Sequence, residues 1–469
     1  MNETEHAQYS RARLARDARF DGVFFTAVKT TGIYCRSICP ATPPLEKNVE
    51  YYLTPVAAAN AGFRPCLRCR PDSAPQSCAW LGAQTRFQRA IKLVDEGALQ
   101  DQTVAELACS LGVSDRYLRD LFQTYLGASP KQYAQYQQCL FAKKLLHDSS
   151  LAINDIAFAA GFNSVRRFND SIKKQLGLTP SDIRKSKKTN TDTIGLNGIC
   201  VNLSYRPPYA WGLLHEFLQR RVIDELEWAD AESYSRTIHY KNSVGYFRVS
   251  APEAMRHKHQ LQFQLYLNSS EHLHVIVTKL RSLFDLDAPI EQIDQHLYEC
   301  VGEFIDYQKG LRVPGIWGTF EAGVRAVLGQ QVSVAAAKKL VTDFVRQLGQ
   351  EIILSDGSRK RLFPTAHEAR QSNLSFFRMP QSRKDTIHRL ADHFIRTDDP
   401  DDIDQWLAIK GIGPWTANYV KLRTSKDPDV WLAGDAGLKN AIKAVGQAPN
   451  LDLTRPWRSY LTMHMWNQL

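Results

Sequence analysis

Four cysteines near the N-terminus constrain the fold of this chain more than any other feature of its sequence. The stretch TTGIYCRSICP places Cys35 and Cys39 four positions apart, and RPCLRCR adds Cys66 and Cys69. Two closely spaced pairs are typical of ligand hairpins that close a tetrahedral thiolate site for Zn²⁺. The spacing therefore predicts a small zinc module. Two roles are open for its thiolates: all four are structural ligands, or one of them is also a nucleophile.

The length and the charge distribution indicate several domains and a polyanionic partner. A chain of 469 residues is too long for a single hydrophobic core. Of the formal charge of +10, most lies in residues 1–188, with 26 Lys and Arg against 17 Asp and Glu. The remaining residues hold 33 against 32. We therefore expect the N-terminal part to bind a polyanion such as DNA.

No stretch of the sequence suggests a membrane segment. There is no run of 18 apolar residues, and the N-terminus MNETEHAQYSRARLARD lacks the apolar segment of a signal peptide. We expect a cytoplasmic protein without membrane contact. In that reducing compartment, paired cysteines indicate a metal site rather than disulfides.

An internal repeat predicts two helix-turn-helix motifs. The stretch LGVSDRYLRDLFQTYLGASP is echoed about 50 residues later by AGFNSVRRFNDSIKKQLGLTP. In each copy a glycine ends a short helix, and Ser114 or Ser164 can cap the helix that follows. DNA-binding helix-turn-helix motifs place their second helix in the DNA major groove. Both copies lie in the basic part of the chain, which favours this role.

Helical spacing separates a buried face from a basic face in both copies. Leu118, Leu121, Phe122 and Tyr125 are spaced so that we expect all four to face the core. Charged residues on the other face either only solvate the surface or contact DNA, and the basic surroundings favour DNA. The residues expected to contact DNA are Arg116, Arg119, Arg166 and Arg167.

The second half of the chain reads as a mixed α/β region followed by helices. Residues 198–280 contain alternating strand-like stretches around one helical stretch, and the pattern from about residue 316 onward is helical with short loops. Gly411 and Gly413 flank Ile412 between two helical stretches, which predicts a helix-hairpin-helix. Such a turn lets backbone N–H groups approach a DNA phosphate, although Gly-x-Gly alone is a weak signal.

The first half of the chain resembles two known families. ARDARFDGVFFTAVKTTGIYCRSICP and EKNVEYYLTPVAAANAGFRPCLRC are similar to the N-terminal domain of Ada-type DNA alkylation-response proteins. The resemblance implies that Cys35 accepts the methyl group and that it ligates zinc together with Cys39, Cys66 and Cys69. Residues 84–184 resemble the AraC-type activator domain, which implies a long helix between the two motifs and RNA polymerase as a partner.

The second half resembles the AlkA-type 3-methyladenine DNA glycosylases. VWLAGDAGLK, GTFEAGVRAVLGQQVSVAAAKKL, RSLFDLD and PWRSY carry the resemblance together with the hairpin. It implies that Asp435 is the catalytic aspartate and that Trp415, where lyase-type relatives carry a lysine, excludes strand nicking. It also implies that Trp415 and Tyr419 stack on an extruded base and that Gln330 lies at the edge of the pocket. Gln331 takes the place of the residue that wedges into the emptied duplex. The residues alone leave a second interpretation open, in which Asp435 is only a helix N-cap and Trp415 and Tyr419 are only core residues.

The expected architecture is multidomain α+β. It combines a small four-cysteine zinc module, an all-α double helix-turn-helix domain, a mixed α/β domain and an all-α helix-hairpin-helix glycosylase domain. The expected boundaries are 1–78, 84–186, a linker at 187–197, 198–282 and 283–469.

The expected function is a bifunctional response to DNA alkylation by a monomer. The chain would accept methyl groups from DNA methylphosphotriesters, activate transcription of repair genes, and excise alkylated bases such as 3-methyladenine. Two alternatives stay open at this point. One is a repair glycosylase whose N-terminal half only binds DNA, and the other is a transcription factor with an inactive glycosylase half.

Overall fold

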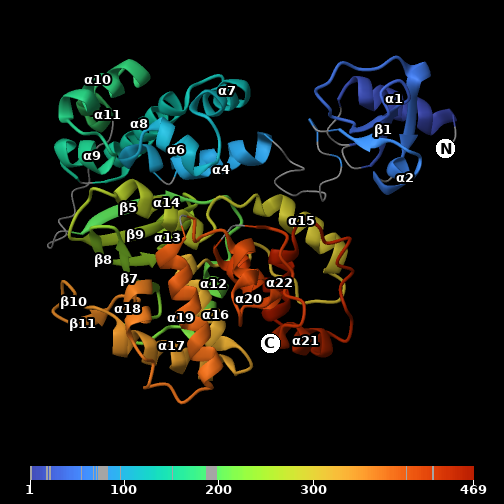
Figure 1. Ribbon diagram of the computed structural model, residues 1–469. Coiled ribbons are helices and arrows are strands. Elements are labelled where there is room, and N and C mark those ends of the chain that lie inside the picture. Colours follow the sequence, from blue (N-terminus) through green and yellow to red (C-terminus); the bar gives the residue numbers. More distant parts are fainter. Residues whose placement is uncertain are drawn as a thin grey trace. The chain divides into compact units, whose positions relative to one another are not determined.

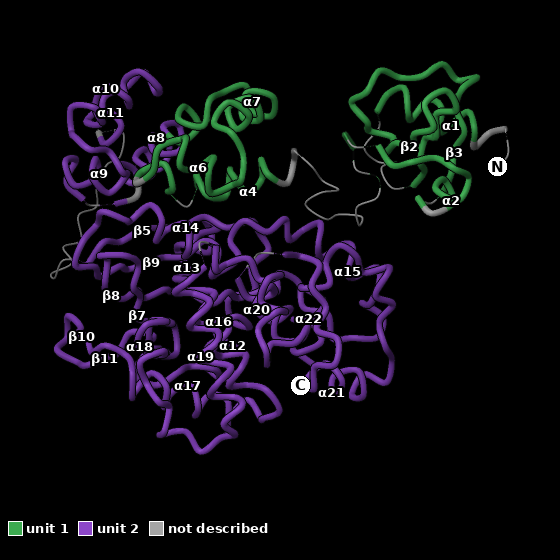
Figure 2. Tube along the Cα trace, viewed as in Figure 1, with its two compact units in different colours: residues 1–134 green, residues 135–469 purple. Residues whose placement is uncertain are grey.

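The structure is a computed structural model (Figure 1). It describes residues 3–16, 20, 23–53, 55–66, 68, 69, 71, 83–95, 97–149, 151–185, 198–397, 399–424 and 427–468. The predicted linker at 187–197 lies outside these residues. The chain forms two compact units, residues 1–134 and residues 135–469 (Figure 2). Among the described residues, no helix has the length and apolar character needed to cross a membrane.

Unit 1 begins with a small sheet of four strands in the order β3-β1-β2-β4. The central strand β1 pairs antiparallel with both β2 and β3, and β2 runs parallel to the short strand β4. Phe24 and Ala27 are fully buried, so a small apolar core lies against the sheet. The elements are α1 (Glu3–Leu14), β1 (Phe25–Val28), β2 (Ile33–Arg36), η2 (Glu46–Asn48), β3 (Val49–Tyr52), α2 (Pro55–Asn60) and β4 (Arg64–Pro65).

The first predicted helix-turn-helix follows in the same unit. Ser114 caps α7, since its hydroxyl accepts a hydrogen bond from the Tyr117 N–H at 3.2 Å. The prediction for Tyr125 was wrong: its side chain is 45% exposed and stacks on Phe87, with ring centroids 4.7 Å apart. Tyr125 lies in the last turn of α7, where Phe87 of α4 covers only part of its side chain and leaves the rest exposed. The helices are α4 (Ala83–Asp95), α5 (Ala98–Asp101), α6 (Val104–Ser110) and α7 (Asp115–Leu126).

The second helix-turn-helix repeats this local design in unit 2. Ser164 caps α10 by accepting from the Arg167 N–H at 3.3 Å, and Gly177 ends the helix in the left-handed conformation. Phe168 and Ile172 of α10 are fully buried. The four arginines expected to contact DNA are exposed in both motifs: Arg116, Arg119, Arg166 and Arg167. The helices are α8 (Pro130–Asp148), whose residues fall in both units, α9 (Ile153–Ala159), α10 (Val165–Leu176) and α11 (Pro180–Lys185).

The mixed α/β region contains an antiparallel sheet with the order β5-β9-β8-β7-β6. Alternate residues of β9 point into the core, where Leu261, Phe263 and Leu265 are fully buried. This alternation confirms the strands expected from the sequence. The elements are β5 (Ile199–Ser204), α12 (Trp211–Arg220), β6 (Glu227–Ala229), β7 (Ser233–Tyr240), β8 (Ser243–Ser250), α13 (Glu253–Arg256), β9 (Gln260–Leu267) and α14 (Leu273–Leu283).

The remainder of unit 2 is helical around the fully buried Trp406. It also contains a two-stranded hairpin of β10 and β11, which was not predicted from the sequence. Strands of three residues are too short to show alternation in a sequence. The elements are α15 (Ile290–Val301), α16 (Thr319–Gly329), α17 (Val334–Leu348), β10 (Glu351–Ile353), β11 (Arg359–Arg361), α18 (Ala366–Gln371), α19 (Gln381–Arg396), η3 (Ile403–Ala408), α20 (Pro414–Thr424), α21 (Ala436–Val445) and α22 (Arg458–Trp466).

A buried network of four charges joins the sheet edge to α16. Arg236 of β7 makes a double hydrogen bond with Glu321 of α16, at 2.8 and 3.2 Å. Arg325 completes the network, 2.7 Å from Glu321 and 2.6 Å from Glu227 of β6. Burial by itself raises the pKa of Glu321, but the two guanidinium groups outweigh it and hold this pKa below its usual value.

Removal of Glu321 should leave two buried guanidinium groups with a single carboxylate, Glu227, so one buried positive charge lacks compensation. We expect Glu321→Ala to lower the free energy of unfolding by about 3–5 kcal/mol, measured by urea unfolding followed by tryptophan fluorescence. The control is Glu216→Ala, which breaks an exposed ion pair with Arg220 on α12 and should change the same free energy by less than about 0.5 kcal/mol. Equal losses in the two variants would contradict the role of the network.

Candidate functional site

The four predicted cysteines come together in unit 1. Cys35 lies on β2, Cys39 follows in the next turn, Cys66 comes directly after β4, and Cys69 follows it. All four sulfur atoms lie within 4.8 Å of one another. A tetrahedral Zn²⁺ ion with Zn–S bonds of about 2.3 Å requires sulfur atoms about 3.8 Å apart. The cluster therefore fits a zinc ion with little adjustment.

The four cysteines differ in exposure, and the thiols of Cys35 and Cys39 differ in proton affinity. Cys66 and Cys69 are buried, each 7% exposed, whereas Cys35 and Cys39 are half-buried. Hydrogen bonds to Cys39 and then to Cys69 raise the pKa of the Cys35 thiol, and the hydrogen bond with Cys35 lowers the pKa of Cys39 to about 2. The backbone N–H of Arg36 donates to the Cys69 sulfur at 3.4 Å. Without a cation the cluster therefore favours the thiolate form at Cys39 but not at Cys35 or Cys69, and a divalent cation would stabilise the negative charge of the other sulfurs as well.

In unit 2, Asp435 is held by hydrogen bonds from three parts of the chain. Its Oδ1 accepts from the Leu438 N–H at 2.9 Å, so Asp435 is the N-cap of α21. The same oxygen accepts from the Trp466 indole N–H at 3.0 Å, and Oδ2 accepts from the Trp415 indole N–H at 3.2 Å. These three hydrogen bonds fix the orientation of the carboxylate. Asp435 therefore caps α21, the alternative role considered from the sequence, and at the same time contacts the two indoles.

Asp435 lines a cavity of about 900 Å³. Trp415 and Tyr419, one turn apart on α20, form part of the wall, and their rings stack with centroids 5.5 Å apart. Both rings also pack against the hydrophobic cores on either side, so they are core residues and cavity residues at once. This volume is large enough for a purine base, since pockets for small ligands typically enclose about 300–1,000 Å³.

Trp466 is a site residue that the sequence analysis missed. It lies at the end of α22, 31 residues beyond Asp435. Gly437 makes its approach possible, because a Cβ there would lie 3.2 Å from the indole nitrogen and 3.0 Å from Asp435 Oδ1. The second glycine of VWLAGDAGLK was therefore the available signal, but it does not say which side chain fills the space.

The sequence analysis also missed two arginines on the cavity wall. The guanidinium of Arg221 lies 3.8 Å from the centre of the Phe217 ring. Arg423 donates to the Tyr419 hydroxyl at 3.3 Å and to the Pro314 carbonyl at 2.6 Å. Burial and then repulsion by Arg423 lower the pKa of Arg221 to about 10, so Arg221 remains charged at neutral pH. Positive charge therefore lies close to the stacked aromatics.

The predicted hairpin and the loop before α17 lie next to each other. Gln330 donates to the Gly411 carbonyl at 3.1 Å and to the Thr416 hydroxyl at 3.0 Å, so it ties this loop to the hairpin while it lines the cavity. Gly411 has φ +100°, and a Cβ there would lie 2.0 Å from the Thr386 hydroxyl, which explains the glycine. Gln331 is exposed and has φ +56°, a strained conformation for a residue other than glycine.

Family models match three parts of the chain. The metal binding domain of Ada matches residues 8–72, a helix-turn-helix domain matches residues 107–186, and the AlkA N-terminal domain matches residues 200–318. The first match contains all four cysteines of the cluster. The second contains both helix-turn-helix motifs apart from the first residues of α6.

Curated relatives match nearly the whole chain. A Mycobacterium tuberculosis protein named probable bifunctional transcriptional activator/DNA repair enzyme AlkA is 35% identical over 98% of this chain and 95% of its own length. The chain belongs to this family of bifunctional Ada–AlkA proteins. DNA-3-methyladenine glycosylase 2 of Escherichia coli is 30% identical over 56% of this chain and 95% of its own length. The bifunctional activator and repair enzyme AdaA of Bacillus subtilis is 31% identical over 38% of this chain and 82% of its own length.

For this Ada–AlkA protein, the comparisons and the geometry agree on the metal centre. The matched Ada domain is a metal-binding domain, and four thiolates at these distances are a typical structural donor set for zinc. The cofactor is therefore Zn²⁺, as the cysteine spacing predicted. The expected fold class, with a zinc module, helix-turn-helix motifs, a mixed sheet region and a helical region, is also confirmed.

The purified protein should contain one equivalent of zinc per chain. We expect Cys66→Ser to lose most of this zinc, because a hydroxyl is a poor replacement for a thiolate ligand. The matched control is Cys109→Ser, which changes an exposed cysteine outside the cluster and should retain the metal. Metal analysis by mass spectrometry measures both, and full zinc occupancy in Cys66→Ser would exclude this ligand set.

Proposed function

We propose that the cavity beside Asp435 excises alkylated bases from DNA. The observation that carries this proposal is a carboxylate fixed by two indoles and a helix N-terminus at the wall of a cavity large enough for a base. Cleavage of the N-glycosidic bond develops positive charge on the sugar, and a fixed carboxylate stabilises that charge or activates water. An alkylated purine that is already cationic leaves without protonation, so one carboxylate suffices.

The proposed reaction requires the base to leave the duplex and enter the cavity. The stacked Trp415 and Tyr419 offer electron-rich faces to a cationic ring. Gln330 forms the edge of the pocket, and the exposed Gln331 projects from the loop as the candidate wedge into the emptied duplex. We further propose that the hairpin at Gly411 and Gly413 binds a DNA phosphate through its backbone N–H groups. Release of the base without strand nicking agrees with Trp415 at the position where lyases carry a lysine.

The test of this proposal is Asp435→Asn, which keeps the size of the side chain and much of its capping ability while it removes the charge. We expect this variant to fold and to bind DNA but to release 3-methyladenine at least ~100-fold more slowly, the scale of losing one preorganised electrostatic contact. The control is Asp356→Asn, which changes an exposed aspartate outside the cavity lining. Near-normal base release by a folded Asp435→Asn protein would refute the assignment.

We propose that Cys35 removes methyl groups from DNA methylphosphotriesters. Its sulfur attacks the methyl carbon, the carbon–oxygen bond breaks, and the electron pair leaves with the phosphate, which becomes an ordinary diester anion. Exposure narrows the choice to Cys35 and Cys39, because a reactive sulfur must be reached by DNA and the other two sulfurs are buried. The resemblance of the CRSIC stretch to the Ada family favours Cys35 of these two. Methylation turns a thiolate into a neutral thioether, so it reduces the repulsion of the phosphate backbone and should strengthen DNA binding.

Incubation with methylphosphotriester DNA should add a single methyl group to the protein. Peptide mass spectrometry should locate it on the peptide that contains Cys35, and Cys35→Ala should accept none. Cys139→Ala is the control, because this buried cysteine lies outside the cluster and its loss should leave methyl acceptance unchanged. A methyl group on Cys39, Cys66 or Cys69 would show that a different ligand reacts.

The remaining assignments complete this proposal. Methylation would act on transcription through the two helix-turn-helix motifs, which bind promoter DNA through Arg116, Arg119, Arg166 and Arg167 and recruit RNA polymerase. The protein would act as a monomer in the cytoplasm, where reducing conditions keep the thiolates available. The proposed functional segments are 1–78 for methyl acceptance, 84–186 for promoter binding, a linker at 187–197, and 198–282 and 283–469 for base excision.

A further inference from the structure

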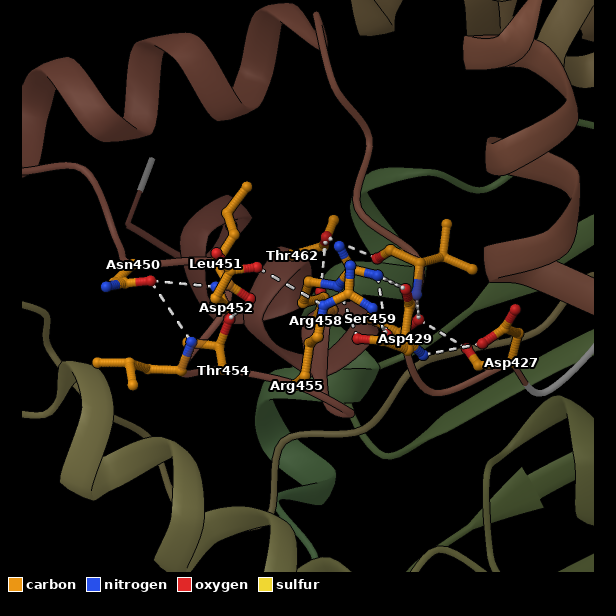
Figure 3. Close-up of polar contacts among 12 residues, drawn as sticks. Asp427, Asp429, Asn450, Leu451, Asp452, Thr454, Arg455, Arg458, Ser459 and Thr462 are labelled. Atoms are coloured by element: carbon orange, nitrogen blue, oxygen red, sulfur yellow. Dashed lines mark hydrogen bonds and ion pairs between the residues drawn. The ribbon is translucent and has the colours of Figure 1, made fainter. Parts of the chain in front are cut away.

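The segment that carries Asp435 is attached to the start of α22. Residues 427–435 form neither a helix nor a strand, so their own backbone does not determine their position. Arg458, the first residue of α22, makes a double hydrogen bond with Asp429, Nε to Oδ1 at 2.6 Å and Nη2 to Oδ2 at 2.8 Å (Figure 3). Its Nη2 also donates to the Asp429 carbonyl at 3.0 Å. The guanidinium therefore binds both the side chain and the backbone of this segment.

Ser459 adds backbone contacts at the same place (Figure 3). Its hydroxyl donates to the Asp427 carbonyl at 2.6 Å and accepts from the Val430 N–H at 2.9 Å. Its own backbone N–H donates to the Pro428 carbonyl at 2.9 Å. Ser459 is only 1% exposed, so water does not compete for these hydrogen bonds. Arg458 and Ser459 are the central residues of PWRSY, a motif to which the proposed function assigns no role.

The far end of the same helix contacts the far end of the same segment. Trp466 lies eight residues after Arg458, about 12 Å along the helix, and its indole donates to Asp435 Oδ1. The segment from Asp429 to Asp435 is thus attached to α22 at two points. Between them, the Leu432 side chain is fully buried in the same hydrophobic core as α22. The attachment at Arg458 therefore determines which part of the segment reaches Trp466.

We propose that Asp429, Arg458 and Ser459 are positioning residues for base excision. They set the register of residues 427–435 on α22 and so place the Asp435 carboxylate at the cavity wall. None of the three lines the cavity, so they act through Asp435 and not on the base. The proposal rests on the function proposed above for Asp435. Arg458 and Asp429 are only 18% and 22% exposed, so their ion pair is less screened by water than a surface pair.

Two variants weaken the attachment without touching the cavity. Arg458→Gln removes the double hydrogen bond, and Asp429→Asn keeps the shape of the side chain while it removes the charge. In the full-length protein we expect each to slow single-turnover release of 3-methyladenine from methylated duplex DNA about 10- to 100-fold, because small displacements of a catalytic group have effects of this size. The matched control is Arg370→Gln, which breaks a 2.8 Å pair with Asp392 outside the cavity and should not change the rate.

A double-variant comparison separates positioning from general loss of stability. If Arg458 acts through the Asp435 carboxylate, addition of Arg458→Gln to the Asp435→Asn variant should slow its base release by less than about twofold. The carboxylate that Arg458 positions is already absent from that variant. If Arg458→Gln does not fold, Asp429→Asn can replace it in the same comparison of base-release rates with and without Asp435→Asn. A further 10-fold loss in the Asp435→Asn background, or an unchanged rate for both variants alone, would overturn the positioning role. A near-normal rate for Asp435→Asn by itself would instead overturn the proposed function, and the positioning role with it.

Discussion

The carboxylate of Asp435 depends on three hydrogen bonds, and the arrangement of the C-terminal helices follows from them. One donor is the backbone of α21, one is an indole from α20, and one is an indole from α22. These helices must therefore converge on a single side chain, and the cavity lies where they meet. In the proposed reaction, a carboxylate fixed in this way would need no reorganisation when charge develops on the sugar, which is how preorganised sites lower an activation barrier.

The buried network of Arg236, Glu227, Arg325 and Glu321 holds a second part of the cavity wall. It joins β6 and β7 to α16, and three of its members also line the cavity wall. Desolvation makes such a network costly, so it is weak evidence for stability by itself. Its directional hydrogen bonds nevertheless admit only one arrangement of sheet and helix, and this keeps the wall near the stacked aromatics in place.

The zinc module solves a different physical problem. A four-stranded sheet with so few buried side chains has little apolar surface to stabilise it, and four metal–thiolate bonds supply the missing free energy of folding. In the proposed function the same ligand set holds the fold and provides the nucleophile. The unequal burial of the cysteines is compatible with both proposed roles, because Cys66 and Cys69 are buried whereas Cys35 is half-buried.

The sequence by itself determined the features that depend on neighbours within a few residues. These include the paired cysteines, the caps at Ser114 and Ser164 and the alternation of β9, because each follows from local backbone geometry. It failed for Tyr125, where helical periodicity predicts a face but not how completely the neighbouring helix covers it. Tertiary structure alone decided the contact of Trp466 with Asp435 and the ion pair of Asp429 with Arg458. Their partners lie 31 and 29 residues apart, and only the packing of α22 against the segment before α21 brings them together.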